Sequence, residues 1–417
     1  MVQVDDQPSE VASRRPGWLS APVLGVAGIS VASGFAQFAV TAVIGDVAAD
    51  FGAPGAGLDP ASQIGLTGTT LGVALATIRL ASLGALPGTA LADRLGRRRV
   101  LLATLVIGLI FTIASAGAPT FWIWVALVAL ARPWLSTVNG IAGVLGAEET
   151  SAKDRSAAVA VVGGAYGLGA GAVAVLRSVL PPGEWRLVIA LSLLALAAVP
   201  WLSRQIREPA VFVEAKGPRS KLLGAVPLQH RRLVALLCAV TAGMGIATGP
   251  GFTYIFVFGE RMVGATPEAM SAIILAAGPT GLLGLLAGRW GAEHLGRRPT
   301  AALAMSATAG AVALAYSGSY SALVAGYLLG ITVSAAFGPP MGALVAEAFP
   351  TSLRSTATGW ISAAGVIGAV TGLALYGVLV DVLGSFASAA ILLSSPVILI
   401  AALLWWVPET RGQELHD

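Results

Sequence analysis

The sequence has little with which to face water, form disulfides or hold a metal. Only 11% of its 417 residues are charged, and it contains three histidines and one cysteine, Cys238. Soluble domains carry about a quarter charged residues, and a single cysteine cannot form an internal disulfide. A metal-ligand cluster, a nucleophile elbow and a nucleotide-binding loop are also missing. We therefore expect no enzyme, no resident metal or cofactor and no ATP-driven pump.

Long apolar segments take the place of the missing charge. Apolar residues make up 56% of the chain, and its mean hydropathy is +0.82. A helix of about 20 residues crosses a hydrocarbon core, and lipid forces such a segment to be helical. The expected spans are 20–44, 63–88, 100–118, 121–146, 157–177, 187–203, 233–258, 268–288, 299–317, 321–346, 356–380 and 386–406. The sequence therefore predicts an all-α membrane protein with twelve transmembrane helices in a lipid bilayer.

The basic residues predict the orientation of these helices. Most Lys and Arg residues outside the spans fall on the side of both termini, whereas the opposite side holds only Arg177, Arg186 and Arg261. Cytoplasmic loops are enriched in basic residues. We therefore expect both termini in the cytoplasm and the protein in the cell (inner) membrane. This placement explains the net charge of +4 without a nucleic-acid partner.

The chain divides into two related parts. The polar connection 204–232 separates an expected six-helix half, 1–203, from a second, 233–417. A set of glycines and charges in the first half recurs 200 positions later: Gly88, Asp93, Gly96, Arg97 and Arg98 correspond to Gly288, Glu293, Gly296, Arg297 and Arg298. Such a repeat indicates an internal duplication, as is common in transporters.

The repeated loops also resemble those of a known family. Segment 88–99 resembles the signature loop of the major facilitator superfamily. Segments 347–354 (Glu-Ala-Phe-Pro-Thr-Ser-Leu-Arg) and 408–412 (Pro-Glu-Thr-Arg-Gly) resemble motifs of its sugar-porter-like, metabolite-symporter-like branch. The resemblance implies two pseudo-symmetric six-helix bundles and a secondary transporter that works by alternating access.

The resemblance further implies that charged residues at the cytoplasmic ends form gates. Such salt-bridge clusters would hold the two halves together on the inside when the site opens outward. The alternative is that these side chains are solvated loop charges. The gating residues implied are Asp93, Arg97, Arg98, Glu148, Arg155, Glu293, Arg297, Arg298, Glu347 and Arg354.

Two arginines fall inside expected spans, where no acidic residue is available to pair with them. Arg132 lies about 16 Å into its span by helical rise, and Arg79 lies at a comparable depth. An arginine at the bilayer centre costs at least ~2.5–3.5 kcal/mol on insertion scales. A ligand carboxylate or phosphate would supply the missing charge and match the guanidinium fork. Alternatively, Arg132 serves proton coupling or structure, and Arg79 snorkels or binds backbone carbonyls.

Other polar and aromatic residues share the expected cavity. Helical spacing places some on the face of Arg132, and the resemblance places others on cavity-lining helices. The remaining candidate substrate-binding residues are Gln37, Ser136, Asn139, Tyr166, Thr248, Tyr254, Tyr327 and Trp360. Two segments, Gly249–Pro250–Gly251 and Gly338–Pro339–Pro340, are expected to break their helices and act as gating bends.

These features favour a secondary transporter for a small organic anion such as a carboxylate. Coupling to protons, as in a symporter, and exchange, as in an antiporter, are both open. A drug or sugar transporter is the alternative, and it predicts an apolar cavity with the arginines locked away. A membrane sensor that has lost transport is a different class, which the short flanking segments 1–17 and 407–417 disfavour. We expect a monomer.

Overall fold

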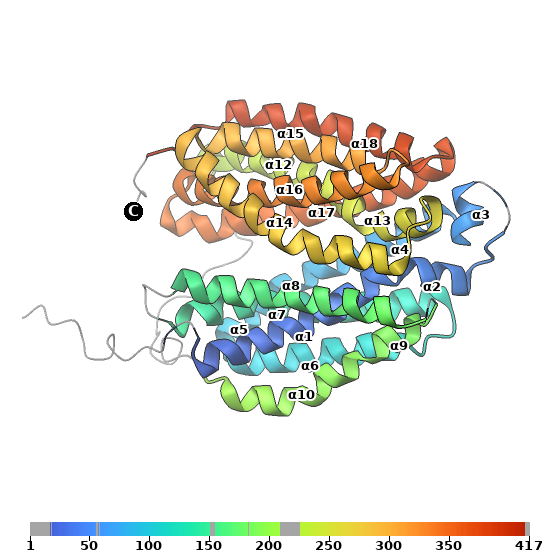
Figure 1. Cartoon of the computed structure of the whole chain (residues 1–417). Helices are drawn as coiled ribbons and strands as arrows, with labels where there is room; N and C mark the ends of the chain where they lie inside the picture. The colour runs from blue at the N-terminus through green and yellow to red at the C-terminus, as the bar shows by residue number, and fades with distance from the viewer. Residues whose placement is uncertain are drawn as a thin grey trace, which may run out of the picture.

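The computed structural model describes residues 17, 19–55, 57, 59–150, 155–181, 183–208 and 226–412, without the side chains at 93, 155, 156, 351 and 352. Every regular element in these residues is helical. The long helices run side by side between two ends of the molecule (Figure 1). We call the end where α1 begins at Ala21 the termini end, and the end where α2 and α3 lie the far end.

The first group of helices reaches residue 205. It consists of α1 (Ala21–Ala42), α2 (Ile44–Phe51), α3 (Pro60–Ile64), α4 (Gly68–Ala81), η2 (Ser82–Gly84), α5 (Ala85–Leu95), α6 (Arg97–Ser115), α7 (Phe121–Glu148), α8 (Arg155–Val179), α9 (Trp185–Ala190) and α10 (Ser192–Gln205). The helices α4 and α5, joined by η2, form one membrane crossing, and α9 and α10 form another. With α1, α6, α7 and α8, this group makes six crossings.

The second group begins at residue 228. It consists of α12 (Leu228–Thr253), α13 (Ile255–Val257), the π-helical turn η3 (Phe258–Met262), α14 (Pro267–His294), α15 (Arg297–Ala315), α16 (Tyr320–Ala348), α17 (Thr351–Leu383), α18 (Phe386–Ala401) and η4 (Ala402–Trp406). Eleven helical segments of the described chain are long and apolar enough to span a membrane. The 19-residue α15 adds a twelfth, although its two arginines and many small residues lower its hydropathy. The predicted all-α fold with twelve spans is confirmed.

The helix breaks expected at the two Gly-Pro segments do not occur, and this prediction was wrong. α12 continues through Pro250 to Thr253, and α16 continues through Pro339 and Pro340 to Ala348. A proline removes only one backbone hydrogen bond, and packed membrane helices tolerate that loss.

The two groups repeat the same local structure at the termini end. Gly96 and Gly296 both adopt a positive φ, +105° and +114°, immediately before α6 and α15. The Glu208 carboxylate accepts hydrogen bonds from the backbone N–H groups of Arg97 and Arg98. Glu409 accepts the equivalent bonds from Arg297 and Arg298, at 2.8 Å and 3.1 Å. Each carboxylate therefore satisfies the free N–H groups of one helix start.

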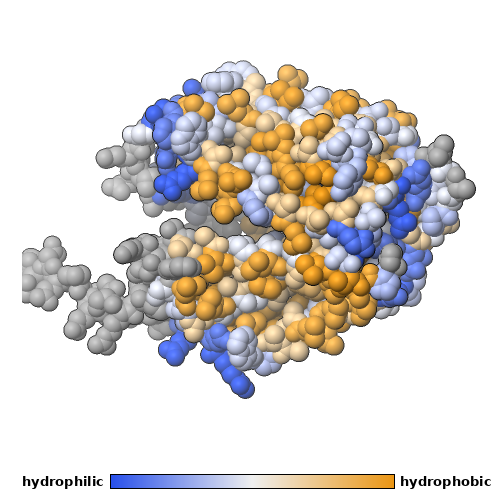
Figure 2. Space-filling model, viewed as in Figure 1, coloured by the Kyte–Doolittle hydropathy of each residue, from blue (hydrophilic) through white to orange (hydrophobic). Residues whose placement is uncertain are grey.

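The apolar core is shared at the far end and divided at the termini end. One cluster joins both groups, including Val43 and Trp124 of the first and Phe256 and Tyr316 of the second. Two further clusters each contain residues of one group only. The surface is correspondingly hollowed between the groups at the termini end (Figure 2). The division at 1–203, 204–232 and 233–417 remains a proposal, because residues 209–225 lie outside the described chain.

Candidate functional site

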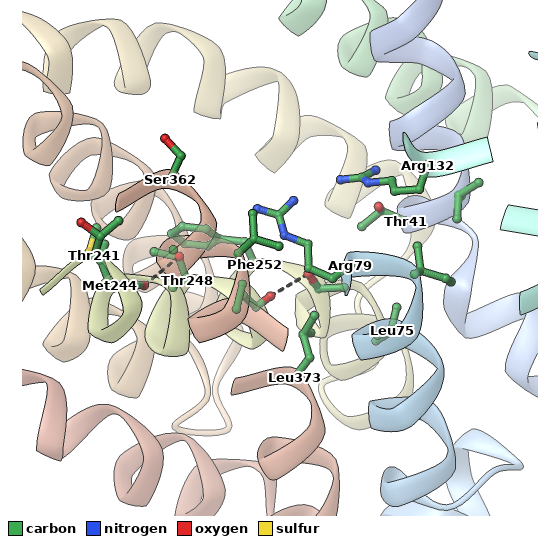
Figure 3. A pocket seen from close by; sticks show the side chains of 18 of the residues that line it. Thr41, Leu75, Arg79, Arg132, Thr241, Met244, Thr248, Phe252, Ser362 and Leu373 are labelled. Atoms are coloured by element: carbon green, nitrogen blue, oxygen red, sulfur yellow. Dashed lines mark hydrogen bonds between the residues drawn. The ribbon is translucent and has the colours of Figure 1, made fainter. Parts of the chain in front are cut away.

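A central cavity of about 520 Å³ lies between the two groups of helices. Its first-group wall comes from α1, α4 and α7, and its second-group wall from α12, α16 and α17. The lining residues include Thr41, Leu75, Arg79, Arg132, Thr241, Met244, Thr248, Phe252, Thr253, Phe337, Ser362 and Leu373, most of which Figure 3 labels. Cavities of 300–1,000 Å³ are typical of small-molecule sites.

Arg79 on α4 and Arg132 on α7 carry the charge of this cavity. Their guanidinium groups extend into the same space (Figure 3). In the described part of the chain neither guanidinium forms a hydrogen bond or ion pair, and the Arg132 Nε is buried without a partner. Tyr166 lies on α8 and is not among the cavity-lining residues. Two neighbouring unpaired cations create a strongly positive wall, which favours an anionic ligand.

The opposite wall is apolar and hydroxylated. Phe252, Phe337 and Met244 supply the apolar surface. Thr248 and Thr253 donate their hydroxyl hydrogens to carbonyls of their own helix, at 2.8 Å and 2.6 Å. Their oxygens therefore face a ligand as acceptors. The cavity is thus cationic on one side and apolar with acceptor groups on the other.

Two predicted site residues, Gln37 on α1 and Asn139 on α7, are linked through Ser33. Gln37 Nε2 donates to Ser33 Oγ at 3.0 Å, and Ser33 Oγ donates to Asn139 Oδ1 at 2.9 Å. Gln37 is 4% exposed and does not line the cavity. Ser136 is partly buried on α7. This network fixes the contact between α1 and the helix that carries Arg132.

The predicted aromatic residues lie elsewhere. Tyr254 is fully buried at the far end, where it packs against Tyr376 with ring centroids 4.9 Å apart. Tyr327 is buried behind Phe252, in an edge-to-face contact at 5.8 Å. Trp360 is 42% exposed and is not among the cavity-lining residues. Of the eight additional candidates, Thr248 alone lines the cavity.

The predicted gating residues pair within each half in this conformation. Arg97 forms an ion pair with Glu148, and Arg297 binds Glu347 at 2.9 Å in the corresponding place. Glu293 binds the exposed Arg289. The remaining arginines of the set bind backbone carbonyls: Arg98 that of Ser203, Arg298 those of Trp405 and Val407, and Arg354 that of Phe349. The side chains of Asp93 and Arg155 lie outside the described residues.

The connections across the two halves lie instead at the far end. Arg177 on α8 binds Asp46 at 2.8 Å and Glu260 at 2.7 Å. Arg261 approaches Asp46 at 3.6 Å from the second half. The Asp381 carboxylate on α17 accepts hydrogen bonds from the N-terminus of α4, including the Gly68 N–H at 2.7 Å. We call Asp46, Arg177, Glu260 and Arg261 the far-end latch. The sequence analysis did not predict it, although Arg177 and Arg261 are two of the three basic residues expected on that side of the membrane.

The fold and the cavity define a secondary membrane transporter. Two bundles are closed against each other at one end and open at the other, and a charged cavity lies between them. Residues 26–292 and 263–417 match the model of the Major Facilitator Superfamily. The chain belongs to this family, whose members are transporters, so it is a multi-pass membrane transporter of small molecules and not an enzyme.

Similar proteins agree with this assignment. A probable 4-methylmuconolactone transporter of Cupriavidus pinatubonensis is 25% identical over 375 residues, which cover 85% of each chain. The crystal structure of a D-xylose–proton symporter has a TM-score of 0.71 at 17% identity and covers 95% of this chain and 99% of that one. A human organic anion transporter has a TM-score of 0.65 at 18% identity, with 95% and 100% coverage. These two structures show the fold alone.

Proposed function

We propose that this transporter moves a small organic anion, such as a carboxylate, across the cell (inner) membrane by alternating access, with both termini in the cytoplasm. The observation that carries the proposal is the pair Arg79 and Arg132, which line the cavity with no acidic partner in the described chain. A bound carboxylate would accept hydrogen bonds from the guanidinium forks and offset their charge.

The two walls suggest how the anion binds. The charged end would contact Arg79 and Arg132, while the body of the ligand would lie against Phe252, Phe337 and Met244. Burial of apolar surface contributes about 25 cal/mol per Å². A carboxylate attached to a ring or a branched chain therefore fits both walls better than a small inorganic anion does.

Coupling to protons or to a counter-anion completes the proposed cycle. Either a co-transported proton or an exchanged counter-anion would offset the charge that the transported anion carries across the membrane. Exchange requires only that a second anion occupies the same arginines on the return step. Symport requires that a proton accompanies the anion, carried by the ligand itself or by a protein group.

Thermal unfolding of the purified protein with added ligands tests the substrate class. The panel contains benzoate, 4-methylmuconolactone, phosphate, D-xylose and a cationic drug. A ligand that binds only the folded state stabilises it by about 2.7 kcal/mol at 100 times its Kd. We expect stabilisation by the organic anions and its loss in Arg132→Ala. Stabilisation only by D-xylose or the drug, unchanged in Arg132→Ala, would contradict the proposal.

A further inference from the structure

A second cavity continues from the central one toward the termini end. Its volume is about 280 Å³, and it shares Thr241, Phe337 and Ser362 with the central cavity. Its other lining residues all belong to the second half: Gly338, Met341, Gly342, Val345, Ala346, Arg354, Thr358 and Ile361. The two cavities therefore form one continuous path along α12, α16 and α17.

Among the described residues that line this outer cavity, Arg354 is the only charged one. It lies near the start of α17, about 12 Å from Ser362 at 1.5 Å per residue. The other lining side chains are apolar or carry hydroxyls, as on the second-half wall of the central cavity. The outer cavity thus repeats, on a smaller scale, the combination of a guanidinium with an apolar wall.

The hydrogen-bonding capacity of Arg354 is largely unused. Its hydrogen bond in the described chain is a long one, 3.5 Å from Nη2 to the Phe349 carbonyl, and its Nε is buried without a partner. The neighbouring carboxylate Glu347 is already bound by Arg297 and Thr410. A buried, unsatisfied guanidinium donor is costly, so an anion in this cavity would be stabilised by it.

We propose that the outer cavity is a second subsite for organic carboxylates, in which Arg354 binds the carboxylate group and Met341 and Ile361 contact the apolar body. The subsite receives the anion from the termini end and passes it along α17 to Arg79 and Arg132. This inference rests on the proposed function, because it assigns the same class of ligand to both cavities.

Two methionines make the subsites separately observable. Met341 lines the outer cavity and Met244 lines the central one. The photoreactive carboxylate 4-benzoylbenzoate forms covalent bonds with nearby side chains when irradiated, and mass spectrometry locates the labelled residues. The test uses the full chain in lipid nanodiscs. Neutral benzophenone serves as the probe without the charge.

In the unaltered protein we expect 4-benzoylbenzoate to label both methionines. Arg354→Ala should lower labelling of Met341 at least tenfold and leave Met244 labelled, whereas Arg132→Ala should do the reverse. Arg289→Ala removes a solvated arginine outside both cavities and should change neither. Labelling of Met341 and Met244 by benzophenone should be the same in all variants.

A second variant blocks the subsite without removing its charge. A Cβ at Gly342 would meet no atom within 4 Å, so Gly342→Leu projects into the outer cavity without a backbone clash. We expect it to lower Met341 labelling as Arg354→Ala does. Gly310 has equal space on the exposed face of α15, and Gly310→Leu is the matched control.

The outcomes separate the subsite from the proposed function. Met341 labelling that persists in Arg354→Ala would overturn the subsite. An equal decrease at both methionines in Arg354→Ala would also overturn it, because that result identifies Arg354 as a gate. If Met244 labelling also survives Arg132→Ala, the anion function itself fails. Loss of Met244 labelling only in Arg132→Ala, with Met341 unaffected by Arg354→Ala, keeps the function and removes the subsite.

Discussion

Arg177 donates two hydrogen bonds to Glu260, 2.7 Å and 3.2 Å long, and thereby ties α8 of the first half to the end of the α12–η3 crossing in the second. The Arg177 side chain is 7% exposed and the Glu260 side chain 10%. Hydrogen bonds to charged groups stabilise by about 1.5–3 kcal/mol. This pair is therefore a strong contributor to closure at the far end.

The neighbouring charges allow the latch to open without leaving an unpaired buried charge. Arg177 also binds Asp46 of its own half, and Glu260 is followed directly by Arg261. When the halves separate at the far end, Arg177 keeps Asp46 and Glu260 has Arg261 beside it. Each half then contains one acid and one base, which limits the desolvation penalty of switching.

We predict that Glu260→Gln shifts the protein toward the conformation open at the far end. If the conformation closed at the far end loses about 1.5 kcal/mol of stabilising free energy, the ratio of the two conformations changes about tenfold. Spin labels at positions 119 and 317, both exposed at the far end of different halves, measure the separation in a Cys238→Ser background.

Arg289→Ala is the matched control for that experiment. Arg289 binds Glu293 within the second half, and the two side chains are 74% and 49% exposed. Exposed pairs contribute at most about 1 kcal/mol, and this one does not cross between halves. An identical distance distribution in Glu260→Gln and the unaltered protein would rule out the latch.

The paired carboxylate caps predict matched losses of stability. Glu208→Gln and Glu409→Gln each weaken two backbone hydrogen bonds at the start of a helix, and Glu409→Gln also weakens those from the Thr410 and Arg411 N–H groups. We expect each to lower stability by about 1 kcal/mol, measured as a reduced midpoint of thermal unfolding in detergent. Glu293→Gln, which breaks only an exposed pair with Arg289, should change the midpoint little. Unequal effects of the first two variants would show that the duplicated caps are not equivalent.

The close contact between α1 and α8 predicts a strict requirement for glycine. A Cβ at Gly34 would lie 2.2 Å from the Tyr166 carbonyl oxygen, and one at Gly169 would lie 2.3 Å from the Val31 oxygen. Gly34→Ala should therefore force the helices apart and destabilise the fold by about 1–3 kcal/mol. Thermal unfolding measures the loss, and Gly163→Ala, which meets no atom, should be neutral. A neutral Gly34→Ala would mean that these helices are less tightly packed.

Sequence reasoning predicted the elements whose signals are local. Hydropathy located the twelve spans, and the absence of mid-span acids singled out Arg79 and Arg132, both of which line the cavity. The family resemblance implied salt bridges among the charges at the termini end. Arg297 pairs with Glu347 there, within one half, and the gating role of these residues stays a prediction.

The remaining site features depend on how helices rotate and pack, which no local pattern specifies. Tyr254 directly follows the cavity helix α12, yet its ring packs against Tyr376 and Phe386 in the far-end aromatic cluster. The latch of Arg177 with Glu260 joins residues 83 positions apart. Helix spacing along the chain gives no information about such contacts.

The most direct test of the proposed anion site is counterflow of radiolabelled benzoate in proteoliposomes. We predict uptake that Arg132→Ala lowers at least tenfold and that Arg132→Lys partly restores. The Arg289→Ala control should transport normally. Uptake that is equal in Arg132→Ala and in the unaltered protein, or uptake of D-xylose but not of benzoate, would contradict anion binding at Arg132.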